Sequence, residues 1–306
     1  MRIRATVAAV TGAVALSAFA GTAAHAAGND SAYQAAAVKL VQGLHADAAK
    51  QGVRTAPTDG EPYTLNATFS NFKIAKAIKV GTTNQVSVPV SYTLTHGADV
   101  DVQADDFISY AALYKGSYDE PDNVLFGDDV AATCTVVTDT SATCTGTIDI
   151  HPGDGELWNS DAGSWKGAAV AVAFNGQDPE TGDISKIGVA DKGGLTTTSV
   201  LRNSRLTTNA SPEPVKKGAT ITVTGALTRA NWEDNKYHGY TKQSVQLQYK
   251  KKGASSYTTL KTVTSDSKGN LKTTVKASAD GYFRYNFVGT STTPAIASTS
   301  DFVDVK

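Results

Sequence analysis

The sequence predicts an all-β protein with two tandem β-sandwich domains, preceded by a signal peptide and a short helical or disordered leader. Two observations favour this architecture. From Tyr63 onward, apolar and polar residues alternate in short runs separated by Gly, Asn and Asp, as expected for antiparallel strands with one buried face. The net charge also changes sign near residue 195, which divides the strand-forming part of the chain into two halves.

The N-terminus has the residue order of a secretory signal peptide. Arg2 and Arg4 precede an apolar run over residues 5–20, and Ala24-His25-Ala26 supplies an A-x-A cleavage site. This run is shorter than the roughly 20 residues that a bilayer-spanning helix needs. We expect residues 1–26 to be removed and the protein to be secreted. The residue immediately after the cleavage site is Ala27 rather than a cysteine, and no apolar tail ends the sequence, so no membrane anchor is expected.

Residues 27–61 form the expected leader. A helix from Asp30 to Ala49 is predicted because Val38, Val41 and Leu44 fall near one face. Gly43 weakens this helix. A polar segment, residues 55–62, joins it to the strand-forming part.

The first sandwich is expected over residues 62–195 and the second over residues 196–306. The second has the size of an immunoglobulin-like (Ig-like) unit, and a Thr-rich stretch after Gly193-Gly194 marks the boundary. The expected strands include residues 65–72, 86–92, 107–114, 142–150 and 168–174, and then residues 221–223, 245–249, 257–263, 271–275 and 283–287.

The two halves carry opposite charge. Residues 62–195 contain 18 Asp and Glu against 7 Lys and Arg, a net charge of −11, whereas residues 196–306 contain 16 basic against 7 acidic residues, a net charge of +9. Domains of opposite sign can attract each other or two different partners. The asymmetry can equally serve solubility and internal packing.

The two cysteines, Cys134 and Cys144, flank a strand-like segment with a polar centre at Asp139. A hairpin about Asp139 would place the two sulfurs opposite each other. An oxidising compartment preserves such a pair as a disulfide. A metal or redox site would need partners or a C-x-x-C spacing that this sequence lacks.

Several short motifs of the second half carry a family resemblance. They are residues 210–218 (ASPEPVKKG), 223–225 (VTG), 227–232 (LTRANW), 239–240 (GY), 247–249 (LQY), 267–271 (SKGNL), 280–285 (DGYFRY) and 289–293 (GTSTT). This part of the chain resembles the Ig-like secreted proteins of streptomycetes and related actinomycetes. Residues 159–165 also resemble the domain that often precedes this unit. The resemblance implies the fold and an extracellular location, and many such proteins carry the label "calcium-binding".

No catalytic motif is present, so we expect the protein not to be an enzyme. The nucleophile elbow, the zinc-binding H-E-x-x-H helix, the phosphate loop and the dinucleotide-binding glycine turn are all missing. The histidines that follow the signal peptide are scattered, and we expect them on loops or at the surface: they are His45, His96, His151 and His238.

Acidic clusters in the first half suit a calcium ion, which takes six to eight oxygen ligands from carboxylates, carbonyls and amides. The cluster predicted to bind calcium is Asp99, Asp101, Asp105 and Asp106. It is not an EF-hand, because Ala104 and Tyr110 occupy the sixth and twelfth positions from Asp99. The alternative is that these loops are simply solvated surface.

A basic run, Lys250-Lys251-Lys252, stands at the end of an expected strand, in a domain rich in tyrosine. Such a surface can bind an anionic polymer. The alternative is that the tyrosines pack against the core and the lysines protect a strand end from aggregation. Nucleic acid is not expected as a partner outside the cell.

The predicted function is therefore a secreted, non-catalytic, monomeric Ig-like binding or structural protein with calcium as its candidate cofactor. Its partner is an extracellular protein or a wall polymer. One alternative is a wall-associated adhesion module that binds anionic polymer through the basic second domain. Another is a secreted protease inhibitor with an exposed loop such as residues 116–129.

Overall fold

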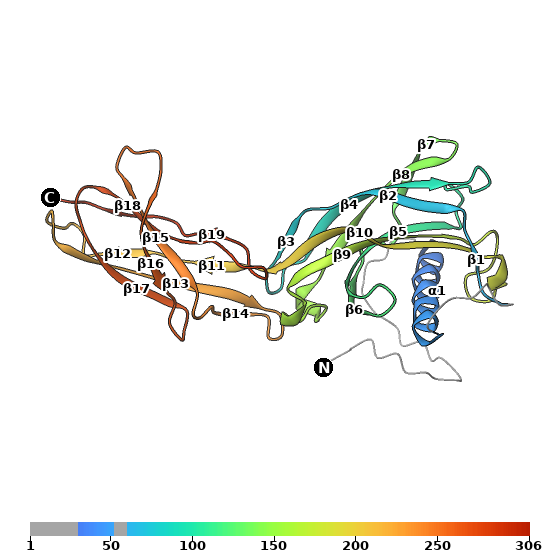
Figure 1. The fold of residues 1–306 in the computed structure, drawn as a ribbon, viewed down its shortest axis with the longest axis horizontal. Helices are drawn as coiled ribbons and strands as arrows, with labels where there is room; N and C mark the ends of the chain where they lie inside the picture. The colour runs from blue at the N-terminus through green and yellow to red at the C-terminus, as the bar shows by residue number, and fades with distance from the viewer. Residues whose placement is uncertain (1–29, 52–59) are drawn as a thin grey trace. The chain divides into compact units, whose positions relative to one another are not determined.

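The computed structural model describes residues 30–51 and 60–306, and its elements are almost all β-strands (Figure 1). The predicted all-β class, built of β-sandwiches, is confirmed. The predicted signal peptide lies outside the described residues. Among the described helices, none has the length and apolar content needed to cross a lipid bilayer.

The contacts of the chain group into two units. Of the described residues, unit 1 contains 30–51, 60–76, 87–150 and 165–198, and unit 2 contains 77–86, 151–164 and 199–306. The expected boundary is a single cut between residues 195 and 196, whereas this grouping divides the chain at residues 198 and 199 and adds two earlier segments to unit 2.

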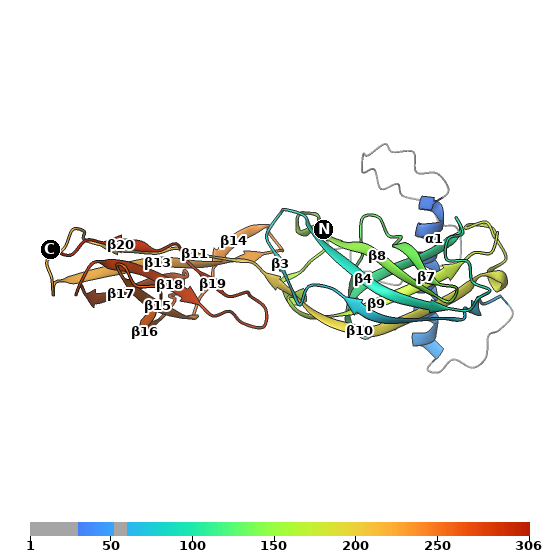
Figure 2. The same ribbon diagram turned by 90° about the horizontal axis from the view of Figure 1, so that it is seen from above.

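Unit 1 is built on two sheets. The first has the order β1 (Tyr63–Thr64), β10 (Gly188–Arg202), β9 (Gly163–Ala173), β5 (Phe107–Gly116) and β6 (Pro121–Leu125). The last residues of β10 belong to unit 2, where they pair with β3 (Ala77–Val80). The second has the order β2 (Ala67–Lys73), β4 (Val86–His96), β8 (Ser141–Ile150) and β7 (Thr133–Thr138). Figure 2 shows β4, β7 and β8 together in this second sheet.

Strand β5 is buried from Phe107 to Tyr114 because both of its faces are covered. On one face, Ser109 lies against the second sheet, where its hydroxyl is 2.7 Å from the hydroxyl of Tyr92 on β4. On the other face, Ile108 and Tyr110 pack against helix α1 (Asp30–Gln51).

The predicted leader helix is therefore part of the core of unit 1. Ala37 and Val41, four residues apart, are buried against the β5 and β9 strands. Figure 1 shows helix α1 beside β5. The Gln34 side-chain oxygen accepts a hydrogen bond from the Val130 amide at 3.1 Å, and His45 Nε2 lies 2.6 Å from a carboxylate oxygen of Asp191. Short 3-10 helices lie at Pro152–Asp154, Asn159–Asp161 and Ile184–Lys186.

The predicted disulfide between Cys134 and Cys144 is present. The two residues are directly paired in the β7–β8 hairpin, which turns at Asp139 and Thr140 as expected. Residues 116–129, expected as an exposed loop, instead contain β6, which forms a hairpin with β5. A continuous loop for a protease is therefore not formed there.

Unit 2 is a second sandwich. One sheet contains β11 (Ser204–Leu206), β13 (Thr220–Asn231), β12 (Asn209–Ser211), β14 (Lys236–Gly239) and β17 (Asn270–Lys276). The other contains β16 (Thr258–Thr264), β15 (Ser244–Lys251), β18 (Gly281–Phe287), β19 (Ile296–Ala297) and β20 (Asp301–Val303). Alternate residues of both sheets form one core, and the Tyr285 hydroxyl donates to the Val223 carbonyl at 3.0 Å across it.

Candidate polyanion-binding face

The outward surface of the β15–β18 pair gathers cationic, aromatic and amide side chains in unit 2. Side chains alternate between the two faces of a strand, so the neighbours of the buried Leu247 and Phe283 point away from the core. The register pairs Gln248 with Arg284, and Phe302 of β20 is paired with Tyr282. We call the following residues the outer face: Gln246, Gln248, Lys250, Lys252, Tyr257, Tyr282, Arg284, Asn286 and Phe302.

The cations of the outer face lie over its aromatic rings. The Arg284 Cζ atom is 3.8 Å from the centre of the Tyr257 ring. Lys250 Nζ is 5.0 Å from the centre of the Tyr257 ring and 5.2 Å from that of Tyr282. The Tyr282 and Phe302 rings are 5.1 Å apart, and Lys252 Nζ lies 5.4 Å from the latter. Cation–π contacts of this kind hold long, flexible side chains in place.

Amide side chains fix the remaining geometry. The Gln248 side-chain oxygen accepts a hydrogen bond from Arg284 Nε at 2.9 Å, and its nitrogen donates to Gln246 Oε1 at 3.2 Å. The same Gln246 oxygen accepts from Asn286 Nδ2 at 3.1 Å. The face therefore presents a connected row of polar groups beside its rings.

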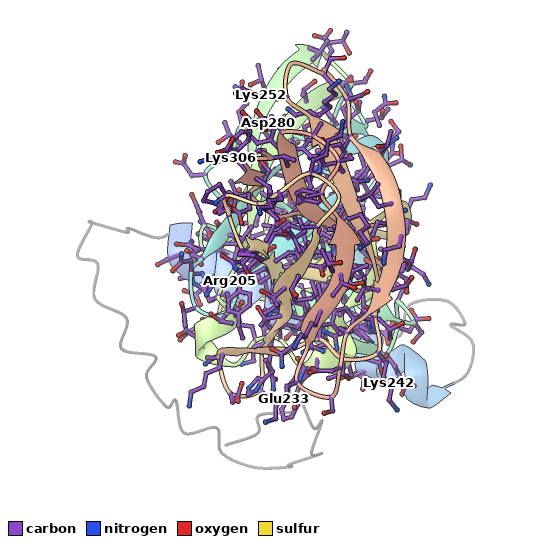
Figure 3. All side chains as sticks on the ribbon, turned by 90° about the vertical axis from the view of Figure 1, so that its left-hand side faces the viewer. Arg205, Glu233, Lys242, Lys252, Asp280 and Lys306 are labelled. Carbon is purple, nitrogen blue, oxygen red and sulfur yellow. A yellow bond between two sulfur atoms is a disulfide. The ribbon has the colours of Figure 1, made fainter. Side chains whose placement is uncertain are left out.

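The positive charge of the outer face is largely unbalanced. Lys252 forms an exposed ion pair with Asp280 at 3.5 Å, and Figure 3 shows the two side by side. The pKa of the Asp280 carboxyl is lowered first by the hydrogen bond from the Val305 amide and then by Lys252. Across the part of the chain that the structure describes, Lys250 and Arg284 have no carboxylate within ion-pairing distance.

Two of the three predicted lysines belong to this face. Lys250 and Lys252 lie over rings, whereas Lys251 is exposed and paired in register with Gly281, without a ring contact. Sequence reasoning missed Tyr257, Arg284 and Phe302. The alternation of Tyr282, Phe283 and Arg284 could have placed the arginine outward, but the partners of Tyr257 and Phe302 depend on pairing between separate strands.

The predicted calcium ligands lie elsewhere, on the loop between β4 and β5 in unit 1. Asp99 and Asp101 line a hollow of about 350 Å³ that also includes His96 and Asp139. Asp105 and Asp106 do not line it, and Asp106 accepts a hydrogen bond from the Gly176 amide at 2.6 Å. Within residues 30–51 and 60–306, no three His, Cys, Asp or Glu side chains form a group that could hold a metal ion. Calcium binding by these four residues stays a prediction.

Two histidines differ from the surface loop positions expected for them. His96 is buried at the end of β4, where its Nδ1 lies 2.9 Å from the Gly97 carbonyl. His45 packs edge-on against Tyr118 at 4.6 Å. Burial, and next the charge of Asp191, raise the pKa of Tyr118 well above its ordinary range. The contacts of His45 join helix α1 to the first sheet of unit 1, so they have a structural role. The outer face of unit 2 is therefore the candidate site.

Comparison with known proteins identifies no family. No family model matches the chain, and no curated protein matches it. Matching solved structures include the Escherichia coli adhesin FdeC (TM-score 0.29, 15% identity) and the Yersinia pseudotuberculosis adhesin InvE (0.24, 13%). A third contains three N-terminal domains of the outer capsid protein Hoc of bacteriophage RB49 (0.27, 10%).

These matches cover 83%, 81% and 79% of this chain and, in the same order, 67%, 61% and 70% of the other chains. The chain therefore spans less than two thirds of the InvE chain.

Proposed function

We propose that this protein is an extracellular, non-catalytic binding protein whose outer face in unit 2 holds an anionic polysaccharide. The observation that carries the proposal is that Lys250 and Arg284 lie over the half-buried rings of Tyr257 and Tyr282 and have no carboxylate partner among the described residues. A sugar ring can pack against an aromatic ring, while Lys250 and Arg284 neutralise its acidic groups. The amides of Gln246 and Asn286 can bond its hydroxyls.

The extracellular location is supported by the disulfide between Cys134 and Cys144, because such bonds persist in oxidising compartments. The signal peptide expected over residues 1–26 agrees with it. Held non-covalently by a wall polymer, the protein would act as an adhesion module.

Binding of the full chain to immobilised polygalacturonate tests this function, with a neutral glucan as the second surface. We expect binding to the acidic polymer that weakens as salt rises, since salt screens exposed charges. The double variant Lys250→Gln, Arg284→Gln should bind at least about tenfold more weakly, the size expected for losing charged hydrogen bonds.

The matched control is Lys272→Gln, Lys276→Gln, which removes the same charge from exposed positions of β17 in the other sheet. Tyr257→Ala should also weaken binding, because it removes a ring without changing charge. If the control and the double variant lost the same binding affinity, the effect would come from net charge alone, and the assignment of binding to the outer face would be refuted.

A further inference from the structure

A second cationic site lies in unit 2 where β10 ends. Arg202 is only 9% exposed, and its Nε donates to the Ala230 carbonyl of β13 at 2.7 Å. Its backbone amide donates to the Thr292 carbonyl at 3.0 Å. The first bond holds the guanidinium of Arg202 against β13, and the second holds its main chain beside the turn at residues 290–293.

A second guanidinium joins it from β13. Arg229 Nη1 donates to the Thr293 hydroxyl at 3.3 Å, and its Cζ lies 4.0 Å from the centre of the Tyr240 ring. Burial, and next the positive charge of Arg229, lower the pKa of Arg202 to about 10. The two cations therefore repel each other in a poorly solvated place.

Nothing in the described chain neutralises this pair directly. Over residues 30–51 and 60–306, no carboxylate lies within ion-pairing distance of Arg202 or Arg229, and Glu233 acts on Arg202 only as a more distant charge. The terminal nitrogens of Arg202 have no hydrogen-bond partner among these residues and are not sealed from solvent. A buried cation without a neutralising carboxylate is costly, so the buried Arg202, with the half-buried Arg229 beside it, favours a bound anion.

The neighbouring turn adds hydroxyl groups. A hydrogen bond from the Thr290 amide to the Thr293 carbonyl, 2.8 Å long, closes the turn, and the hydroxyls of Thr290 and Thr292 lie 3.4 Å apart in it. Two guanidinium groups and these hydroxyls offer more donors than a planar carboxylate accepts, and suit the three or four oxygens of a tetrahedral group.

We propose that Arg202, Arg229 and the turn at residues 290–293 bind a tetrahedral oxyanion, the phosphate or sulfate group of an extracellular ligand. This site is separate from the outer face and does not depend on the proposed function. Because it is formed by two arginines, it selects the oxyanion by geometry as well as by charge.

Thermal melting and calorimetric titration of the full chain with inorganic phosphate and with sulfate test the site, at constant ionic strength maintained with chloride. We expect saturable binding and a higher melting temperature of unit 2, because a ligand of the folded state stabilises it. The ion that binds more tightly shows whether the natural ligand carries a phosphate or a sulfate group. Acetate should bind at least about tenfold more weakly, because a carboxylate satisfies fewer donors.

Arg202→Lys and Arg229→Lys keep the charge and lose the fork of donors, so each should weaken binding about tenfold or more. Circular dichroism confirms folding, and the exposed Lys276→Gln serves as the control. Arg284→Gln, which alters only the outer face, should bind the oxyanion as the unchanged protein does. Acetate binding of equal strength, absence of saturation, or lysine variants that bind normally would each overturn the site.

Discussion

Replacing Trp232 by alanine should destabilise unit 2 more than almost any other single change. The side chain is 2% exposed, and its Nε1 donates to the Gly81 carbonyl at 2.8 Å. Its backbone amide donates to the Asn159 side-chain oxygen at 3.1 Å. Trp232 therefore ties residues 77–86 and 151–164 to the strands of unit 2.

The expected size follows from these contacts. Truncating a buried tryptophan to alanine costs about 3–5 kcal/mol. Trp232→Phe keeps most of the ring but leaves the Gly81 carbonyl unpaired, which costs about 1–3 kcal/mol. The control Val288→Ala changes a side chain that is 62% exposed, and should stay within about 0.5 kcal/mol of the unchanged protein.

Urea unfolding of the full chain, followed by circular dichroism and by amide hydrogen exchange in each unit, measures these losses. Exchange in unit 1 should be unchanged. A fragment of residues 196–306 lacks Gly81 and Asn159, so it should be less stable than unit 2 in the full chain by about the Trp232→Ala cost or more. A loss below about 1 kcal/mol for Trp232→Ala, or a fragment as stable as the intact unit, would refute this reasoning.

Three further predictions concern the disulfide, calcium and alkaline pH. Replacing Cys134 and Cys144 by serine should cost unit 1 about 3 kcal/mol in denaturant unfolding, since the bond closes a short loop; an unchanged midpoint would contradict this. Millimolar calcium should raise the melting temperature of unit 1 relative to chelator, by about 2.7 kcal/mol of stability at a hundredfold excess over Kd; an equal effect of magnesium would leave only charge screening. Burial raises the pKa of Tyr285 to about 12, so the stability that this neutral phenol contributes below pH 10 should be lost as pH rises from 10 to 12. A Tyr285→Phe variant whose unit 2 loses as much stability over the same pH range would contradict that.

Local patterns in the sequence were sufficient for several of the strands and for the disulfide, but not for β10 (Gly188–Arg202), which spans the predicted domain boundary. The alternation at Phe283, Tyr285 and Phe287 appears unchanged as the buried face of β18, because side chains alternate along any strand whatever its partner is. Cys134 and Cys144 are close in sequence, so one hairpin brings them together. Lys250 and Lys252 were named as candidates from the run of three lysines, and their role in binding stays a proposal.

Contacts between distant segments were decided only by the tertiary structure. Trp232 and Gly81 are 151 residues apart, and no local pattern indicates that a tryptophan will donate to that carbonyl. The Arg284 guanidinium lies over the Tyr257 ring because β16, which directly follows Tyr257, and β18 pair with opposite sides of β15. Arg202 lies near Arg229 because the last residues of β10 belong to unit 2. A period of two residues determines which face a side chain occupies, whereas strand order and register determine its neighbours, and these depend on packing of the whole chain.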